Sequence, residues 1–288
     1  TPAMYSMMSH IDLNLGVWYP MGGLGAVVQA IQRLAEAAGA RFRFGCPVRR
    51  IVVEGGRVTG VATDDGTLPA EVVVANADYR HVEMELLEPQ HRQYGERYWS
   101  SRVIGPSSFV AYVGMEGRLE ELAHHTLFLE ADWMTHFNSI YRRPAWPERA
   151  PYYVCCPSRT DPAMAPPGGE NLFVLVPVAA GLDDPDDVRE RQAEWVLGDL
   201  ERQLGRVLGG RMVVRRLFSH RDFTQRYNAY RGTALGLAHT LRQTAIFRPR
   251  HRSRKVGGLY YTGQYCHPGV GMPMTLISSQ ILARELRA

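Results

Sequence analysis

The chain has 288 residues, of which 45% are hydrophobic and 22% charged, with a formal net charge of +4. These fractions are those of a globular protein with one large or two ordinary domains. The sequence contains no internal repeat and no low-complexity tract, and no apolar run reaches the roughly 18–20 residues that cross a bilayer. The four cysteines (Cys46, Cys155, Cys156 and Cys266) have no CxxC spacing. We therefore expect reduced thiols and a cytoplasmic setting.

The first folded segment reads as a helix followed by a meander of strands. Apolar residues recur on one stripe of residues 24–38 (Val27, Val28, Ile31, Leu34, Ala35 and Ala38), which predicts an amphipathic helix. Strands are predicted at 42–44, 48–53 and 58–63, with a glycine hairpin turn at 54–57. The apolar run at 71–75 predicts a strand that is covered on both faces.

Polar residues follow this apolar run directly, at Asn76 and Asp78. Ligands of parallel sheets gather at the carboxyl ends of their strands, so these side chains are candidates for binding. The same residue types also cap the N-terminus of a following helix. The sequence leaves both interpretations open, and one residue can do both.

Residues 83–223 have a different sequence pattern, in which strand-like runs alternate with loops rich in Pro, Gly and Asp. The runs lie at 108–115, 126–129, 152–156, 172–177 and 213–218. One long helical pattern covers 188–207, with Ala193, Val196, Leu197, Leu200 and Leu204 on one face. We expect a mixed sheet backed by helices.

The C-terminal stretch 257–288 predicts a strand, a glycine-rich turn and a helix. Gly263, Gly269 and Gly271 allow close approach of the backbone, and Pro273 suits a first helical turn. Amide groups at such a helix N-terminus favour partial negative charge. A phosphate or the N1/O2 edge of a reduced flavin would satisfy them. The alternative is a tight turn that is packed for its own sake.

Several ordered blocks resemble the bacterial-type phytoene desaturase family, which includes carotenoid desaturases and isomerases. They are YTGQYCHPGVGMPM at 261–274, YNAYRGTALG at 227–236, FRP at 247–249 and GVWYPMGGL at 16–24. The resemblance implies an FAD-dependent α/β flavoprotein with two dinucleotide-binding domains and an α+β insert. Residues 1–20 and 83–225 would form the mixed-sheet substrate domain. Residues 21–82 (helix, β-meander and buried strand) and 226–288 would belong to the FAD domain.

The resemblance also implies which residues contact FAD. They are Val48, Asn76, Gly263, Gln264, Gly269, Gly271, Met272, Pro273 and Met274. It identifies no catalytic residue, although Tyr230, Arg231 and His267 are weak candidates beside the expected flavin. A buried tyrosine, a surface arginine and a histidine that braces its loop are the ordinary alternatives.

The implied reaction is desaturation of a long apolar polyene such as phytoene in carotenoid biosynthesis. Within the same framework, an isomerase or a saturase is the alternative. An amine-oxidase-like enzyme is disfavoured, because Gln264 stands where that group carries a glutamate. The GxGxxG segment of an FAD site is not found, so we expect a C-terminal portion whose ADP-binding half lies upstream. An inactive fragment or a binding module is the non-enzymatic alternative.

Two further expectations concern metals and surfaces. His10, His81, His124, His125 and His136 show no metal-ligand spacing, so no metal site is expected.

The basic run 248–255, from Arg248 to Lys255, is either a solvated loop or a surface that attracts anionic lipids. Nucleic acid is disfavoured, because the run has no interleaved aromatics. We expect a protein that is peripheral at the membrane.

Overall fold

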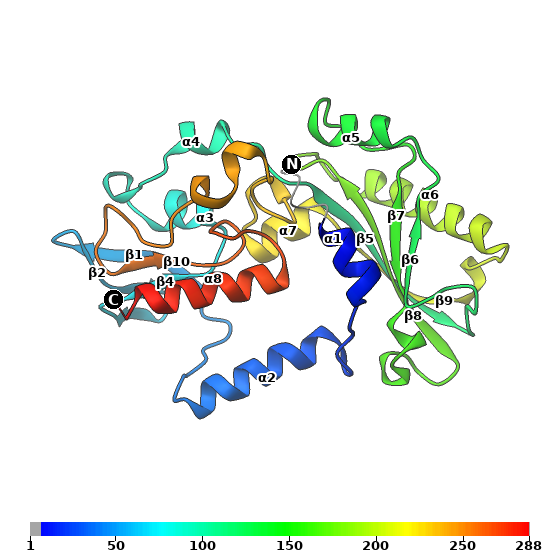
Figure 1. The fold of residues 1–288 in the computed structure, drawn as a ribbon, viewed down its shortest axis with the longest axis horizontal. Coiled ribbons are helices and arrows are strands. Elements are labelled where there is room, and N and C mark those ends of the chain that lie inside the picture. Colours follow the sequence, from blue (N-terminus) through cyan, green and yellow to red (C-terminus); the bar gives the residue numbers. More distant parts are fainter. Residues whose placement is uncertain (1–6, 288) are drawn as a thin grey trace. The chain divides into compact units, whose positions relative to one another are not determined.

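A computed structural model describes residues 7–287, which divide into two compact units (Figure 1). Unit 1 comprises 43–106 and 223–287, and unit 2 comprises 7–42 and 107–222. The predicted domain boundaries lie at 20/21, 82/83 and 225/226, and residues 1–6 fall outside the described part. Because compactness does not assign a role to a segment, the functional domain assignment stays a prediction.

Unit 1 begins with the predicted meander. Strands β1 (Val48–Glu54), β2 (Arg57–Thr63) and β3 (Gly66–Pro69) pair antiparallel in that order. Gly55 and Gly56 adopt positive φ in the β1–β2 turn, which only glycine does without strain. The strand predicted at 42–44 is wrong, since the chain there runs as an irregular connection.

A two-stranded parallel sheet joins distant parts of unit 1. β4 (Val73–Ala75) pairs with β10 (Leu259–Tyr261), with Val73 opposite Leu259. The prediction that this run is covered on both faces is wrong, because Val72 is 50% exposed and Val74 is 42% exposed. Val72 and Val74 project to the same face of the run, and the described residues leave that face partly uncovered.

The core of unit 1 is aromatic. The ring of Tyr79, in α3 (Tyr79–His81), stacks on Tyr261 at 3.9 Å, and both pack near the fully buried Trp99 of α4 (Glu96–Ser100). The buried carboxylate of Glu83 accepts a hydrogen bond from the Tyr261 hydroxyl at 2.5 Å. Burial raises the pKa of Glu83. This cluster holds β10 against the helices and thereby fixes where the C-terminal turn starts.

The remaining elements of unit 1 are short, apart from the last helix. A π-helical turn (Val82–Leu86) follows α3, and 3₁₀ turns lie at Pro89–His91, Tyr230–Gly232, Leu241–Gln243 and Ala245–Phe247. The predicted C-terminal helix is present as α8 (Met272–Glu285). Helix α7 (His220–Tyr227) runs from unit 2 into unit 1.

Unit 2 is built on a five-stranded sheet in the order β6-β7-β8-β5-β9. The strands are β5 (Ser107–Glu116), β6 (His125–Phe128), β7 (Tyr152–Cys155), β8 (Gly169–Val178) and β9 (Met212–Phe218). All four described pairings are antiparallel, so the expected mixed sheet is corrected to an antiparallel one. Apolar runs predict strands but carry no information on strand direction. The α/β class with its α+β region is confirmed.

Helix α6 (Asp186–Leu204) covers one face of this sheet, as Figure 1 shows. Its buried residues include Ala193, Val196, Leu197 and Leu200, which the periodicity predicted. Two aspartates occupy its first turn and Gly205 ends it at φ 62°, the expected charge and C-cap pattern. Short 3₁₀ turns occupy Pro157–Arg159, Pro162–Met164 and Gly209–Arg211.

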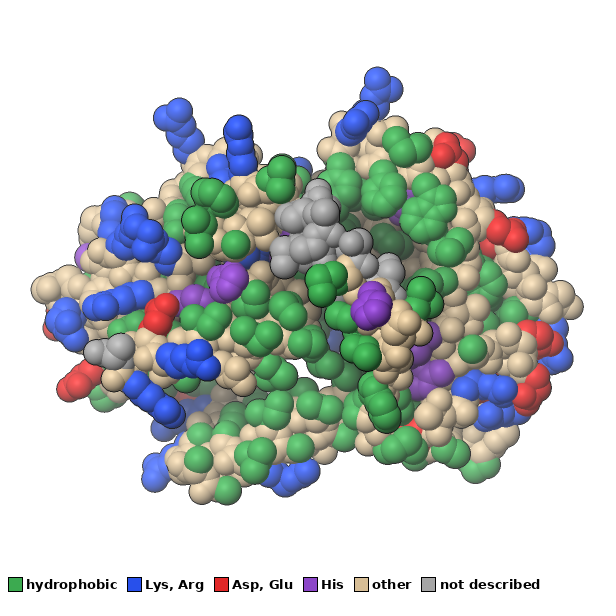
Figure 2. All heavy atoms as spheres, in the orientation of Figure 1, with side chains coloured by type: hydrophobic (Ala, Val, Ile, Leu, Met, Phe, Trp, Pro, Cys, Tyr) green, Lys and Arg blue, Asp and Glu red, His purple; other side chains and the backbone are tan. Residues whose placement is uncertain are grey.

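The N-terminal helices of unit 2 are α1 (Met7–His10), a π-helical turn (Ile11–Leu15) and α2 (Gly23–Ala37). The amphipathic helix is confirmed, but α2 has no buried residue. Its stripe, which includes Val28, Ile31 and Leu34, is exposed, and Figure 2 shows hydrophobic side chains along α2. An apolar stripe of this kind is a surface for a further partner element.

No helix within residues 7–287 combines the length and apolar character needed to cross a membrane.

One buried histidine gives a pH prediction. His136, in α5 (Trp133–Tyr141), is buried, and neither ring nitrogen has a hydrogen-bond partner among the described residues. Burial lowers its pKa. The pKa of a histidine in the unfolded chain is about 6.5, and here the pKa in the folded protein is lower. The folded state is therefore fully stable above about pH 6.5, and it loses stability as the pH falls toward the folded-state pKa, because protonation favours the unfolded chain. We expect His136→Met to raise the melting temperature at pH 5.5 more than at pH 7.5.

Thermal unfolding of the two proteins at both pH values measures this difference. His10→Gln, at an exposed histidine, serves as the control and should retain the parental pH dependence. An equal acid destabilisation in His136→Met and the parent would show that this imidazole is not the responsible group.

Candidate functional site

A cavity of about 640 Å³ opens in unit 1 where β4 and β10 end. Because the two strands are parallel, the residues that follow them, Asn76 and Thr262, come out at the same edge. The lining residues are Asn76, Ala77, Asp78, Phe223, Arg226, Tyr227, Asn228, Ala229, Thr233, Ala234, Thr262, Gly263, Gln264 and Thr275. The volume falls within the range of small-molecule sites, about 300–1,000 Å³.

The glycine turn is fixed at its start by close contacts. Gly263 has φ +102°, and a Cβ there would lie 2.7 Å from the side-chain oxygen of Asn76. Its amide donates to the Ser278 hydroxyl of α8 at 3.2 Å, and that hydroxyl also pairs with Thr262 at 3.1 Å. The turn, the strand end and α8 are therefore held together at a position that only glycine fits.

Asp78 is the buried carboxylate of this edge. One oxygen accepts the His81 amide at 3.0 Å and so caps α3. The other accepts the Tyr230 amide at 3.0 Å and the Tyr265 hydroxyl. Of the two open interpretations, capping is confirmed for Asp78, which also lines the cavity. Burial and the Asp78 charge raise the pKa of Tyr265.

Arg248 braces the same turn from inside. Its guanidinium donates to the carbonyls of Gln264 at 2.6 Å and of Tyr265 and Cys266 at 3.1 Å each, and to Gln243 at 3.0 Å. Only 4% of Arg248 is exposed. These bonds direct several carbonyls of the turn toward the guanidinium, so the turn is shaped by a side chain 16–18 residues upstream.

The basic run therefore does not form one solvated surface. Arg248 and His251 face inward, and the imidazole of His251 contacts the carbonyls of Tyr261 at 3.1 Å and His267 at 3.0 Å. The outward residues are Arg250, Arg252, Arg254 and Lys255. The expectation that Arg248 is part of a lipid-facing loop is wrong, since buried turn carbonyls need a donor.

The outward arginines line a second cavity of unit 1, of about 700 Å³. Arg250, Arg252 and Arg254 lie there with Ile246 and His267. This cavity is lined by a different set of residues from that at the β4 and β10 ends. The basic side chains thus gather beside an exposed apolar residue.

The residues implied to contact FAD fall into three groups. Asn76, Gly263 and Gln264 line the first cavity. Gly271, which caps α8 at φ 118°, is exposed together with Met272 and Pro273, and Met274 is half-buried. The leading end of α8 is therefore open to a ligand. Gly269 is buried where a Cβ would meet His239 at 2.4 Å, and Val48 opens β1 in the other sheet.

The three weak catalytic candidates do not meet in one cavity. The amide of Tyr230 binds Asp78, and its ring lies 4.5 Å below the guanidinium of Arg80. Arg231 is exposed in a left-handed conformation at φ 56°. His267 is exposed and lines the second cavity. The structure thus brings no two of them together as an acid–base pair.

Sequence reasoning did not single out several residues of the cavity wall. Arg226, Asn228 and Thr275 belong to the lining, and Asn228 adopts φ 52°. An asparagine tolerates this left-handed conformation, so the Tyr-Asn-Ala segment carried a weak turn signal. The hydroxyl of Thr233 donates to the Gly105 carbonyl at 2.9 Å and positions the opposite wall.

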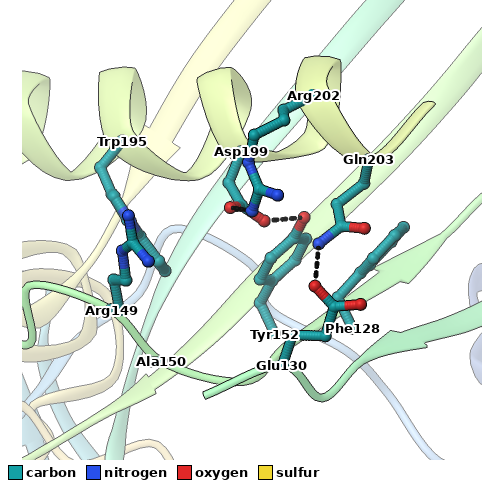
Figure 3. Close-up of a pocket in the computed structure, with 9 residues that line it drawn as sticks. All are labelled: Phe128, Glu130, Arg149, Ala150, Tyr152, Trp195, Asp199, Arg202 and Gln203. Carbon is teal, nitrogen blue, oxygen red and sulfur yellow. Dashed lines mark hydrogen bonds and ion pairs between the residues drawn. The ribbon is translucent and has the colours of Figure 1, made fainter. Parts of the chain in front are cut away.

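A third cavity, in unit 2, is structural. It measures about 20 Å³ and lies between α6 and strands β6 and β7 (Figure 3). There the Tyr152 hydroxyl donates to Asp199 at 2.9 Å, and Gln203 donates to Glu130 at 3.0 Å. Its polar groups bond to one another, and the space is that of about one water molecule.

The first cavity and the adjoining helix end fit part of a flavin. The glycine positions of the turn leave room for close approach, and the amides at the start of α8 and the amide side chain of Gln264 could donate to a planar ring edge. A methyl group at Gly263 would lie against Asn76 and one at Gly269 against His239, so a side chain at either position would displace residues that shape the turn.

The comparisons with known proteins agree with this fit. The model of the family of flavin containing amine oxidoreductases matches residues 2–287. The chain is 50% identical to a carotenoid 3,4-desaturase of Haloarcula japonica, and 35% identical to a zeta-carotene-forming phytoene desaturase of Myxococcus xanthus. Each alignment covers 99% of this chain, but only 58% and 56% of those proteins.

A solved structure, an oxidoreductase from Methanosarcina mazei, matches the fold at a TM-score of 0.66 and 17% identity. That match covers 98% of this chain and 58% of the other. The chain thus spans a little over half the length of the relatives it matches. The predicted flavoprotein class and its FAD cofactor are confirmed, and the chain belongs to the family of flavin containing amine oxidoreductases.

Proposed function

We propose that this chain is part of an FAD-dependent oxidoreductase that desaturates a long apolar polyene such as phytoene. The observation that carries the proposal is the cavity at the ends of β4 and β10, bordered by the glycine turn and the open start of α8. The names of two relatives, a carotenoid 3,4-desaturase and a phytoene desaturase, support the substrate class.

When bound, FAD would supply the acceptor for the hydride equivalent that desaturation removes from the polyene, and the accompanying proton would pass to a base or to solvent. The chain's own residues position the reactants. The amides at the start of α8 would favour negative charge on a flavin bound beside them. Arg248 and Asp78 hold the turn and the cavity wall in place from opposite ends. The described residues of the cavity present no assembled acid–base pair, so we propose that solvent takes the proton.

The face of the unit 2 sheet away from α6 supports binding of an apolar chain. Tyr112 and Phe173 lie opposite each other in register on β5 and β8, with ring centroids 5.4 Å apart. Tyr153 and Leu127 pair on β7 and β6, and Leu127 is exposed. Alternation places these side chains on the face opposite the buried core. We propose this face as a contact for the polyene.

An ADP-binding half preceding these residues would complete the protein. The lengths of the relatives leave room for it, since the chain spans 58% and 56% of theirs. Two apolar surfaces are also uncovered in the described residues. One is formed by Val74 of β4 and Val72 just before it, and the other is the apolar stripe of α2. We propose that this upstream half packs against β4.

The proposed membrane contact rests on the outward side of the basic run. Arg250, Arg252 and Arg254 surround a cavity that Ile246, 88% exposed, also lines. Basic residues attract anionic headgroups by about 1 kcal/mol each near the surface, and an apolar residue among them can enter the acyl boundary. A cytoplasmic protein peripheral at the membrane would reach its polyene substrate this way.

Charge reversal tests the membrane contact. We expect the triple variant Arg250→Glu, Arg252→Glu, Arg254→Glu to bind vesicles of anionic phospholipid at least roughly tenfold more weakly, from the loss of about 1 kcal/mol per charge. Flotation with anionic and with purely zwitterionic vesicles measures it.

The control carries the same change of net charge in unit 2, at Arg191, Arg215 and Arg216, all exposed. It should bind nearly as the parent does. Equal weakening in both triples would mean that net charge alone governs binding, and the basic surface would then have no special role.

The reaction itself is tested with the full-length protein in a bacterium that accumulates phytoene. Desaturation predicts products with additional conjugated double bonds, seen by chromatography and visible absorption. An isomerase would leave the number of double bonds unchanged, and a saturase would reduce it. Peroxide release with amines and no change in polyenes would instead indicate an amine oxidase. A protein that binds no flavin and alters neither substrate would contradict the enzymatic proposal.

A further inference from the structure

A cluster outside the flavin-side cavity involves three potential metal ligands in unit 2. His125 of β6 and Cys155 of β7 lie directly opposite each other in the antiparallel register, and His124 immediately precedes β6. One nitrogen of each histidine and the Cys155 sulfur all lie within 4.8 Å of one another. Thirty residues separate the histidines from the cysteine, so no short spacing in the sequence reveals the group.

Each imidazole is held through its Nδ1 nitrogen. Nδ1 of His124 lies 2.6 Å from the Thr160 hydroxyl, and Nδ1 of His125 lies 2.5 Å from the Tyr153 hydroxyl. If each Nδ1–H donates to its hydroxyl, each Nε2 presents a lone pair. Ligating histidines in metal sites are usually held in this way by the other nitrogen.

The second nitrogen of His124 is an independent observation. Its Nε2 is buried from solvent and has no hydrogen-bond partner within residues 7–287. A buried polar nitrogen without a partner costs free energy. A cation at the cluster would satisfy it, whereas a purely hydrogen-bonded surface cluster leaves it unexplained.

We propose that His124, His125 and Cys155 bind a Zn²⁺ ion, with water as the fourth ligand. Two imidazole nitrogens and one thiolate suit a borderline-soft transition metal. Tetrahedral coordination at the usual bond lengths needs ligand atoms about 3.3–3.6 Å apart. Binding of the ion therefore requires the ligand atoms to approach one another by at most about 1.5 Å, which rotation of the exposed His125 side chain can supply. The Cys155 thiol releases its proton to solvent as the Zn–S bond forms.

The ion would stabilise an edge of the sheet. β6 is an edge strand of four residues that pairs only with β7 in the described sheet. Coordination would add a link between these two strands, and through Thr160 it would reach the segment after β7. The proposed role is structural, and it does not depend on the flavin reaction.

Co²⁺ provides a spectroscopic probe of the site. The full-length protein, freed of any affinity tag and of metal by a chelator, is titrated with Co²⁺. We expect one equivalent to bind with the absorption of a tetrahedral cobalt–thiolate centre, and Zn²⁺ to displace it. Cys155→Ser should abolish the thiolate band, and His125→Ala should weaken Co²⁺ binding roughly tenfold or more. Cys46→Ser, at a half-buried cysteine outside the cluster, should behave as the parent.

A stability measurement guards against variants that fail to fold. Zn²⁺ should raise the melting temperature of the parent and of Cys46→Ser, but not that of His125→Ala, whose side chain is exposed and whose folding is checked by circular dichroism. If the parent shows no thiolate band, or if His125→Ala and Cys155→Ser bind the metal as the parent does, the ion is adventitious and the proposal is overturned.

Discussion

Replacing Arg248 with Ala is expected to remove flavin from the full-length protein and to lower its free energy of unfolding by about 3 kcal/mol. Four carbonyls, those of Gln243, Gln264, Tyr265 and Cys266, lose a charged donor at once. Buried carbonyls without partners favour a rearranged turn. Since that turn leads into α8, the amides at the helix start would lose their position.

Denaturant unfolding and the flavin absorbance of the purified protein measure both effects. Arg252→Ala is the matched control, because Arg252 lies four residues away and is exposed. Arg248→Lys should recover only part of the loss, since an ammonium cannot reproduce the planar fork of a guanidinium. If Arg248→Ala binds flavin as Arg252→Ala does, the turn does not depend on this brace.

Gly263→Ala is expected to weaken flavin binding by roughly tenfold or more and to destabilise the protein by about 1–3 kcal/mol. Two effects combine here. The backbone at φ +102° disfavours a side chain, and the new methyl group would lie 2.7 Å from the Asn76 oxygen. Relief of that contact displaces either Asn76 or the turn, and both border the cavity.

Gly66→Ala separates the two effects. Gly66 of β3 has φ +118°, but a Cβ there meets nothing within 4 Å. The Gly66→Ala variant should therefore lower the free energy of unfolding, because of the backbone strain, but should bind flavin as the parent does. Flavin dissociation constants and unfolding curves for the two variants provide the comparison. Equal flavin affinities for both would mean that the Asn76 contact does not shape the site.

Much of the architecture could be predicted from local pattern. The stripe of α6, the β1–β2 hairpin and the glycine turn before α8 follow from spacing and turn chemistry, because their causes lie within a few residues of sequence. The blocks of family resemblance pointed to the correct flavoprotein class. The same resemblance named Asn76, Gly263 and Gln264 as flavin contacts; the structure brings these three to one cavity, and their contact with flavin stays a prediction.

The errors arose where distant residues decide the outcome. Arg248 looked like a member of a solvated run, and only the folded turn shows which carbonyls it serves. The exposure of Val72 and Val74 depends on what packs against their face of the strand, and the run of valines carries no such information. The pairing of His125 with Cys155 likewise depends on strand register. Local sequence cannot supply contacts of this kind.

The pairing of β4 with β10 has a consequence for synthesis on the ribosome. This parallel sheet cannot form until residues 259–261 have been synthesised, long after residues 73–75. The strands of unit 2, in contrast, all lie in the stretch between these two segments. Domains generally fold as units while the chain emerges. The inserted sheet is therefore expected to fold first and to bring the two flanking halves of unit 1 near each other. A nascent chain stopped before β10 would expose the valines of β4 and depend on chaperones until its last strand appears.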